Sequence, residues 1–243
     1  MAITLRLLGM VELADAAGAS VERVLAQPKR LALLAYLTVS RPPRLHRRDA
    51  LLLMFWPDLD ESRARGALSQ SLSFLRRALG AEVIVSRGAE DVGVDHTRIG
   101  TDVDSFERHA DAGEHVRALS RYQGDFLAAF HVSGCNDFDD WATAERTRLR
   151  ERAVRSAKAV AQTAEVNRDY SAAVVAAQHA LLLAPLDESA ARRVLTALRD
   201  AGRPALAVAE YEAFGRRLRI ALGVEPSAEL RRLAEGIRAG VTL

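Results

Sequence analysis

The sequence predicts a mainly α-helical protein in two parts. Residues 1–100 fit an N-terminal winged helix-turn-helix of α+β type, and residues 101–243 fit an all-α domain of repeated helices. Three patterns support this fold class. Residues 44–80 hold an apolar run, an acidic turn and a longer amphipathic segment. Two short alternating segments follow Gly80, and the C-terminal half repeats itself after 34 residues.

The composition is that of a globular protein. Apolar residues make up 49% and charged residues 27% of the 243 residues, which argues against disorder. No run approaches the ~18 apolar residues of a membrane span, and the first residues lack the layout of a signal peptide. Cys135 is the only cysteine. Since no intrachain disulfide can form, we expect a cytoplasmic location.

Charge is distributed unevenly along the chain. Residues 1–100 carry 14 basic and 11 acidic side chains, residues 101–140 carry 3 and 9, and residues 141–243 carry 17 and 12. The net charges are therefore +3, −6 and +5. A basic N-terminal part is typical of a DNA-binding domain, although an excess of this size favours that function only weakly.

The first part begins with β-structure. ITLRLLG and MVEL alternate or run apolar around a turn at Gly9, which predicts strands within the first 25 residues. Pro28 fits the first position of a helix with an apolar face, and Arg41-Pro42-Pro43 ends that helix.

A helix-turn-helix is expected next. The second helix should cover about His46–Phe55, and its unbroken apolar run predicts burial on nearly all sides. Asp58 and Glu61 have the spacing of a capping box at the start of a third helix, and Gly80 supplies its C-terminal stop. The buried stripe of the third helix consists of Ala64, Leu68, Leu72 (or Ser71), Leu75 and Leu79.

A β-hairpin is predicted after Gly80. EVIVS and DVGVD are separated by Arg87-Gly88-Ala89-Glu90, which is the pattern of two strands and a turn. Strands, three helices and a hairpin in this order make a winged helix, which should end near residue 100.

The sequence pattern of the second part predicts helices only. Two short helices are expected after Asp102, then an irregular stretch, then a long helix from Trp141 to Val166. A shift of 34 residues superposes Tyr170 on Pro204, each at the start of a helix. This is the period of a tetratricopeptide helix pair. A last helix over Ser227–Arg238 would cap the stack.

Several side chains of the first part are candidates for DNA contact. On the exposed face of the third helix, Gln70 could pair with adenine, Ser73 with either base type, and Phe74 could pack on a thymine methyl. His46 at the start of the second helix could contact phosphate. The basic candidates for phosphate or guanine contact are Arg47, Arg48, Arg63, Arg65, Arg76 and Arg77, with Arg87 at the hairpin turn. The alternative is that these arginines form an ordinary solvated helix face.

The acidic turn points to a different partner. Asp58, Asp60 and Glu61 would repel phosphate, so the turn should face away from the DNA backbone, although helix capping also explains Asp58 and Glu61. His131 and Cys135, with their acidic neighbours, match no familiar metal site. We therefore expect no metal, no cofactor and no enzymatic activity.

The quoted segments resemble a known family. RLLG, PKRLALLAYL, LLLMFWPDLDESRARGALSQSLSFLRRALG and the hairpin resemble the winged-helix domain of the bacterial antibiotic regulatory proteins (SARP family). That domain is similar to the OmpR/PhoB-type output domain of response regulators. YQGDFL, DW…ERTRLRERA, LLLAPLDESAARRVLTALRDAGRPALAVAEYEAF and LRIALGVEPSAEL resemble the bacterial transcriptional activator domain that follows it.

The resemblance implies a transcriptional activator. Its partners would be double-stranded promoter DNA, bound at direct repeats, and RNA polymerase, with a homodimer on DNA and no membrane contact. In the similar response-regulator domains, the loop equivalent to Asp58–Glu61 touches the polymerase. Relatives commonly carry arginine at position 74 and a basic residue at position 66, so Phe74 and Gly66 imply altered DNA contacts. The alternative is a tetratricopeptide-like scaffold whose winged helix has lost specific DNA binding.

Overall fold

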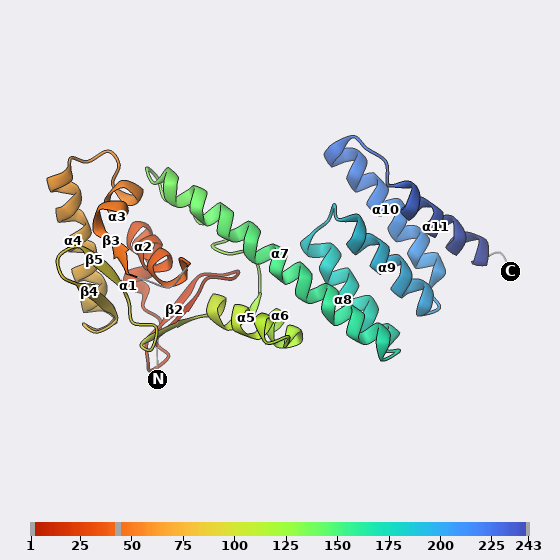
Figure 1. The fold of residues 1–243 in the computed structure, drawn as a ribbon, viewed down its shortest axis with the longest axis horizontal. Coiled ribbons are helices and arrows are strands. Elements are labelled where there is room, and N and C mark those ends of the chain that lie inside the picture. The colour runs from red at the N-terminus through yellow and green to blue at the C-terminus, as the bar shows by residue number, and fades with distance from the viewer. Residues whose placement is uncertain (1–2, 42–44, 242–243) are drawn as a thin grey trace. The chain divides into compact units, whose positions relative to one another are not determined.

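The chain folds into two compact units (Figure 1). The computed structural model describes residues 3–41 and 45–241. Unit 1 comprises Met1–Ala112 and Ser120–Leu149, and unit 2 comprises Gly113–Leu119 and Arg150–Leu243. The protein is mainly helical with a small β part near the N-terminus, which confirms the predicted fold class. The division into domains at 1–100 and 101–243 stays a prediction.

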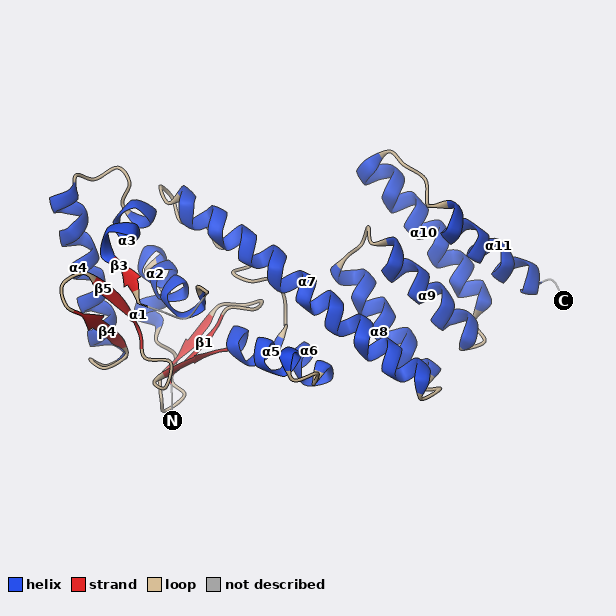
Figure 2. Ribbon diagram, in the orientation of Figure 1, coloured by secondary structure: helices blue, strands red, loops and turns tan. Residues whose placement is uncertain are grey.

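Unit 1 contains all the strands of the described chain (Figure 2). Most of its predicted elements are present, and Pro28 does occupy the first turn of a helix. The predicted stop at Pro42-Pro43 lies outside the described residues. In chain order the elements are β1 (Ile3–Arg6), β2 (Glu12–Ala14), α1 (Glu22–Leu25), α2 (Pro28–Val39), β3 (His46–Arg47), α3 (Arg48–Phe55), α4 (Glu61–Leu79), β4 (Ile84–Arg87), β5 (Asp91–Val94), β6 (Ile99–Thr101), α5 (Asp102–Asp111) and the first part of α7 (Asn136–Val166).

The strands of unit 1 form two small sheets. In one, β1 lies between β2, which is antiparallel to it, and β6, which is parallel. In the other, β5 pairs antiparallel with both β3 and β4. The predicted hairpin is therefore present as β4 and β5. The second helix begins at Arg48 and not at His46, because His46 and Arg47 pair with β5.

Helix α3 is buried on one side only. Leu51, Leu52 and Phe55 are buried, whereas the side chain of Leu53 is 68% exposed. The prediction of a helix buried on nearly all sides was therefore wrong. An apolar run cannot by itself say how many neighbours will pack around it, and here one face remains open to solvent.

An aromatic cluster attaches residues 120–149 to the helices of unit 1. The Phe138 ring lies 5.5 Å from the rings of both Phe55 and Trp141, and the Trp141 ring lies 4.8 Å from that of Tyr36. The long helix α7 therefore begins at Asn136, five residues before the predicted Trp141. Its first turns belong to the core of unit 1.

Unit 2 is a stack of helices. Small side chains dominate its core, with Ala157, Ala161, Ala173 and Ala177 all fully buried. Helices α8 and α10 begin at Tyr170 and Pro204, which confirms the phase of the predicted repeat. The elements are most of α6 (His115–Arg121), the remainder of α7, α8 (Tyr170–Leu183), α9 (Glu188–Asp200), α10 (Pro204–Leu222) and α11 (Ala228–Val241). Within the described residues, no helix combines the length and apolar character needed to cross a membrane.

Candidate nucleic-acid interface

Helix α4 has one buried and one exposed face. Ala64, Leu68, Ser71, Leu72 and Leu75 are buried, as the periodicity predicts, while Leu79 is only half-buried. The opposite face is polar and open to solvent. It carries a row of residues spaced by three or four, which are Gly66, Gln70, Ser73 and Arg77.

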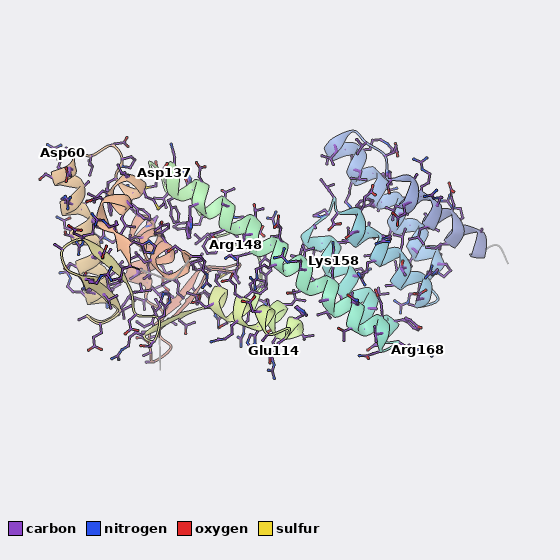
Figure 3. All side chains as sticks on the ribbon, viewed as in Figure 1. Asp60, Glu114, Asp137, Arg148, Lys158 and Arg168 are labelled. Carbon is purple, nitrogen blue, oxygen red and sulfur yellow. The ribbon has the colours of Figure 1, made fainter. Side chains whose placement is uncertain are left out.

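The first turn of α4 is capped by Asp60 (Figure 3). Its Oδ1 accepts a hydrogen bond of 2.9 Å from the backbone N–H of Arg63, and the helix begins at Glu61. The predicted capping box at Asp58 was therefore placed two residues too early. Aspartates at both positions fit the preference for an N-cap, and only the backbone geometry distinguishes them.

Two predicted DNA-contacting arginines form ion pairs with single nearby carboxylates. Arg63 Nε lies 3.2 Å from Asp60 Oδ2, and Arg87 Nη2 lies 2.9 Å from Asp91 Oδ2. The side chains of Arg63 and Arg87 are 78% and 77% exposed. Because an exposed pair contributes little free energy, the guanidinium of Arg63 can exchange partners. The side chain of Asp91 is only 17% exposed, so the Arg87 pair is partly shielded from water.

Five further charges form a continuous row, which we call the charge ladder: Glu90, Arg47, Asp49, Arg65 and Glu61. Arg47 contacts Glu90 at 2.6 Å and Asp49 at 3.6 Å. Arg65 Nη2 lies 2.9 Å from both Asp49 and Glu61. The hydrogen bond to Glu61, and then the charge of Asp49, raise the pKa of Arg65 above its ordinary value. Two predicted contact residues are thus held by three carboxylates.

Arg76 and Arg48 connect the helices to the hairpin. Arg76 donates to the Ile84 carbonyl oxygen at 3.1 Å and to Ser86 Oγ at 2.9 Å. Within the described residues, the side chain of Arg48 donates one long hydrogen bond, of 3.4 Å, to Ser86 Oγ. Its buried Nε has no acceptor among the described residues. Arg76 therefore joins α4 to β4, while the unpaired Nε of Arg48 is enclosed by the protein.

Phe74 and His46 have intramolecular partners. The guanidinium of Arg30, on α2, lies 4.1 Å from the centre of the half-buried Phe74 ring. His46 is buried and its Nε2 lies 2.8 Å from Ser40 Oγ. Since the imidazole is enclosed, the predicted phosphate contact of His46 was wrong.

Arg77 differs from the other candidates. Its side chain is exposed, and no acceptor for its guanidinium is present in the described part of the chain. Its backbone carbonyl accepts a hydrogen bond of 3.3 Å from Arg23 Nη2, which helps to satisfy the end of α4. The guanidinium lies on the same face as Gln70 and Ser73.

The acidic turn packs against a loop that the sequence did not connect to it. The Cys135 thiol donates to the Phe55 carbonyl oxygen at 3.4 Å, just before the turn. A Cβ built at Gly134 would lie 3.8 Å from Asp58 Oδ2. Burial raises the pKa of the Cys135 thiol. Among the described residues, no three His, Cys, Asp or Glu side chains are grouped so that they could hold a metal ion.

Unit 1 is thus a small α+β unit with an exposed polar helix, and unit 2 is a stack of helices. Residues 94–238 match the family described as the bacterial transcriptional activator domain. Because this match covers more than half of the 243 residues, the chain belongs to that family. The family is one of transcriptional regulators and not of enzymes, and the match confirms the activator domain predicted from the sequence.

The fold is also that of a solved structure. It is that of Mycobacterium tuberculosis EmbR in complex with a low-affinity phosphopeptide, with a TM-score of 0.69 and 22% sequence identity. The similarity covers 98% of this chain and 65% of EmbR, so the chain spans about two thirds of the EmbR length. None of the curated proteins compared matches the chain.

Proposed function

We propose that the chain is a cytoplasmic transcriptional activator that binds direct repeats in promoter DNA. In this proposal, unit 1 contains an OmpR/PhoB-type winged helix, and α4 enters the major groove with the β4–β5 hairpin beside it. The observation that carries the proposal is the exposed polar row on α4. A Cβ built at Gly66 has no atom within 4 Å, so this face is open for close approach to DNA.

We assign the proposed DNA contacts to side chains whose hydrogen-bonding groups are not occupied by other groups of the described protein. Gln70 and Ser73 present hydrogen-bonding groups to base edges. Arg77 presents an exposed guanidinium to guanine or phosphate, and for the half-buried Arg48 we propose a phosphate contact, whereas Arg76 is occupied by the hairpin. For Phe74 we propose a packing role against Arg30 in place of the contact with a thymine methyl.

The test of DNA binding is a salt titration on the upstream promoter duplex and on a random duplex. Arg77→Gln should weaken promoter binding roughly fivefold to 100-fold and reduce the salt slope by about one. Arg6→Gln is the matched control, because Arg6 pairs with Glu12 in the other sheet. Equal affinity for both duplexes, or none for either, would contradict the proposal.

We further propose that the acidic turn contacts RNA polymerase. Asp58 and Asp60 are exposed, and their carboxylates are kept from phosphate by repulsion. The double variant Asp58→Asn/Asp60→Asn removes both charges while asparagine still caps α4. Transcription from a promoter template should fall while DNA affinity is retained. Unchanged transcription would dispose of this contact.

A second candidate function is a protein-interaction scaffold. Three aliphatic side chains of unit 2, Val175, Leu182 and Ile220, are 68%, 75% and 87% exposed, as they would be on a partner-binding surface. The ion pairing of Arg47, Arg63, Arg65 and Arg87 also reduces the charge available to phosphate. Failure of the salt titration would favour this function. A homodimer on two repeats is proposed with the activator function alone, and sedimentation of the complex with DNA would test it.

A further inference from the structure

The charge ladder lies among the residues predicted to contact DNA, yet it carries a net negative charge. Its two arginines alternate with three carboxylates, so its formal charge is −1. Glu90 comes from the turn of the hairpin, Asp49 from the first turn of α3, and Glu61 from the first turn of α4. The ladder therefore runs across α3, α4 and the hairpin, which carry arginines predicted to contact DNA.

Asp49 is the central member of the ladder and the only one of its carboxylates that is shared by two arginines. Asp49 Oδ1 lies 2.9 Å from Arg65, and its Oδ2 lies 3.6 Å from Arg47. Glu90 and Glu61 each contact one arginine of the ladder. Removal of the Asp49 charge would therefore loosen both arginines at once.

The ladder is exposed enough for DNA to compete with it. The side chains of Arg47, Arg65 and Asp49 are 59%, 50% and 56% exposed. Water screens such pairs, so they stabilise the fold little, and each arginine could move to a phosphate. In the free protein, however, Asp49 holds both arginines and repels the phosphates that they would contact.

We infer that Asp49 is a specificity-determining residue of the proposed DNA interface. It acts by keeping Arg47 and Arg65 away from phosphates. The inference rests on the proposed function. Affinity for DNA of any sequence depends on how many phosphates the protein neutralises. The base-reading candidates Gln70 and Ser73 stand outside the ladder, so Asp49 lowers sequence-independent binding while it leaves base readout intact.

The experiment compares four proteins, the wild type and three variants of residues 1–243, on promoter and random duplexes over a range of salt. Asp49→Asn should bind random DNA about fivefold to tenfold more tightly, with a salt slope steeper by about one to two, and should discriminate less between the duplexes. Asp49→Glu keeps the negative charge and should behave as wild type. Glu12→Gln makes the same change in net charge away from the ladder and should also behave as wild type.

The outcomes separate this inference from the proposed function. If Asp49→Asn and Glu12→Gln have the same affinities and salt slopes, the inference is overturned, because net charge alone would then account for any change. Equal tightening on both duplexes would overturn it as well, while DNA binding itself would stand. If no protein binds either duplex at low salt, the proposed function fails and the inference fails with it.

Discussion

At the scale of single residues, the role of an arginine is decided by the acceptors within its reach. Arg76 and Arg77 are adjacent, and the sequence placed both among the DNA contacts. In the structure, Arg76 donates to Ile84 and Ser86 of the hairpin, while Arg77 faces solvent. Helical periodicity predicted the faces of α4 correctly. It could not predict that the Ile84 carbonyl oxygen, which follows Gly80 in the chain, would lie within hydrogen-bonding distance of Arg76.

This difference predicts that the two substitutions affect stability to different extents. Arg76→Ala should lower the free energy of unfolding by about 1–3 kcal/mol, because the Ile84 carbonyl and Ser86 lose a charged donor. Arg77→Ala should change it by less than ~0.5 kcal/mol. Urea unfolding measures the loss, and amide hydrogen exchange in β4 and β5 locates it. Equal effects of the two substitutions would refute the structural role of Arg76.

At the scale of elements, long periodic helices were predictable and short paired segments were not. The phase of α8 and α10 followed from a repeat in the sequence alone. The strands β3 and β6 have only two or three residues, and each is defined by a partner strand far along the chain. Local pattern carries little information about such pairing, so the start of α3 was predicted two residues too early.

The start of α9 shows how a side chain from one helix secures another. Asp187 accepts hydrogen bonds of 2.8 and 3.2 Å from the backbone N–H groups of Ser189 and Ala190. Lys158 on α7 donates to the same carboxylate at 2.6 Å. Burial by itself would raise the pKa of Asp187, but the hydrogen bond from Lys158 and that from Ala190 outweigh it, and the pKa lies below its ordinary value.

The lowered pKa of Asp187 predicts a loss of order in acid. Its ionised form stabilises the fold above the pKa of the unfolded chain, and this stabilisation is lost as the pH falls through the lower, folded value. Protection of the Ser189 and Ala190 amides from exchange should therefore decline below about pH 4. In Asp187→Asn the protection should be weaker at neutral pH and should depend less on pH. Asp200→Asn serves as the control, and identical pH profiles for all three proteins would contradict the prediction.

At the scale of the whole molecule, residues 120–149 pack against residues that lie much earlier in the sequence. Leu127 N–H donates to the Leu7 carbonyl oxygen at 2.8 Å, and a Cβ at Gly124 would lie only 3.0 Å from the Gly9 backbone. The sequence predicted an irregular stretch here, but it did not predict which residues this stretch would contact. Glycines at both positions permit the close approach, yet neither glycine indicates the other.

The aromatic cluster provides the test of this packing. Phe138 is fully buried against Phe55 and Trp141, so Phe138→Ala should cost about 3–5 kcal/mol. The largest increase in amide exchange should fall in α2, α3 and the first turns of α7. Phe214→Ala removes a fully buried ring from the core of unit 2 and should act chiefly on α8 to α11. If Phe138→Ala instead loosened α8 to α11 most, residues 120–149 would have to be assigned to the helical stack, and the first turns of α7 would not belong to the core of unit 1.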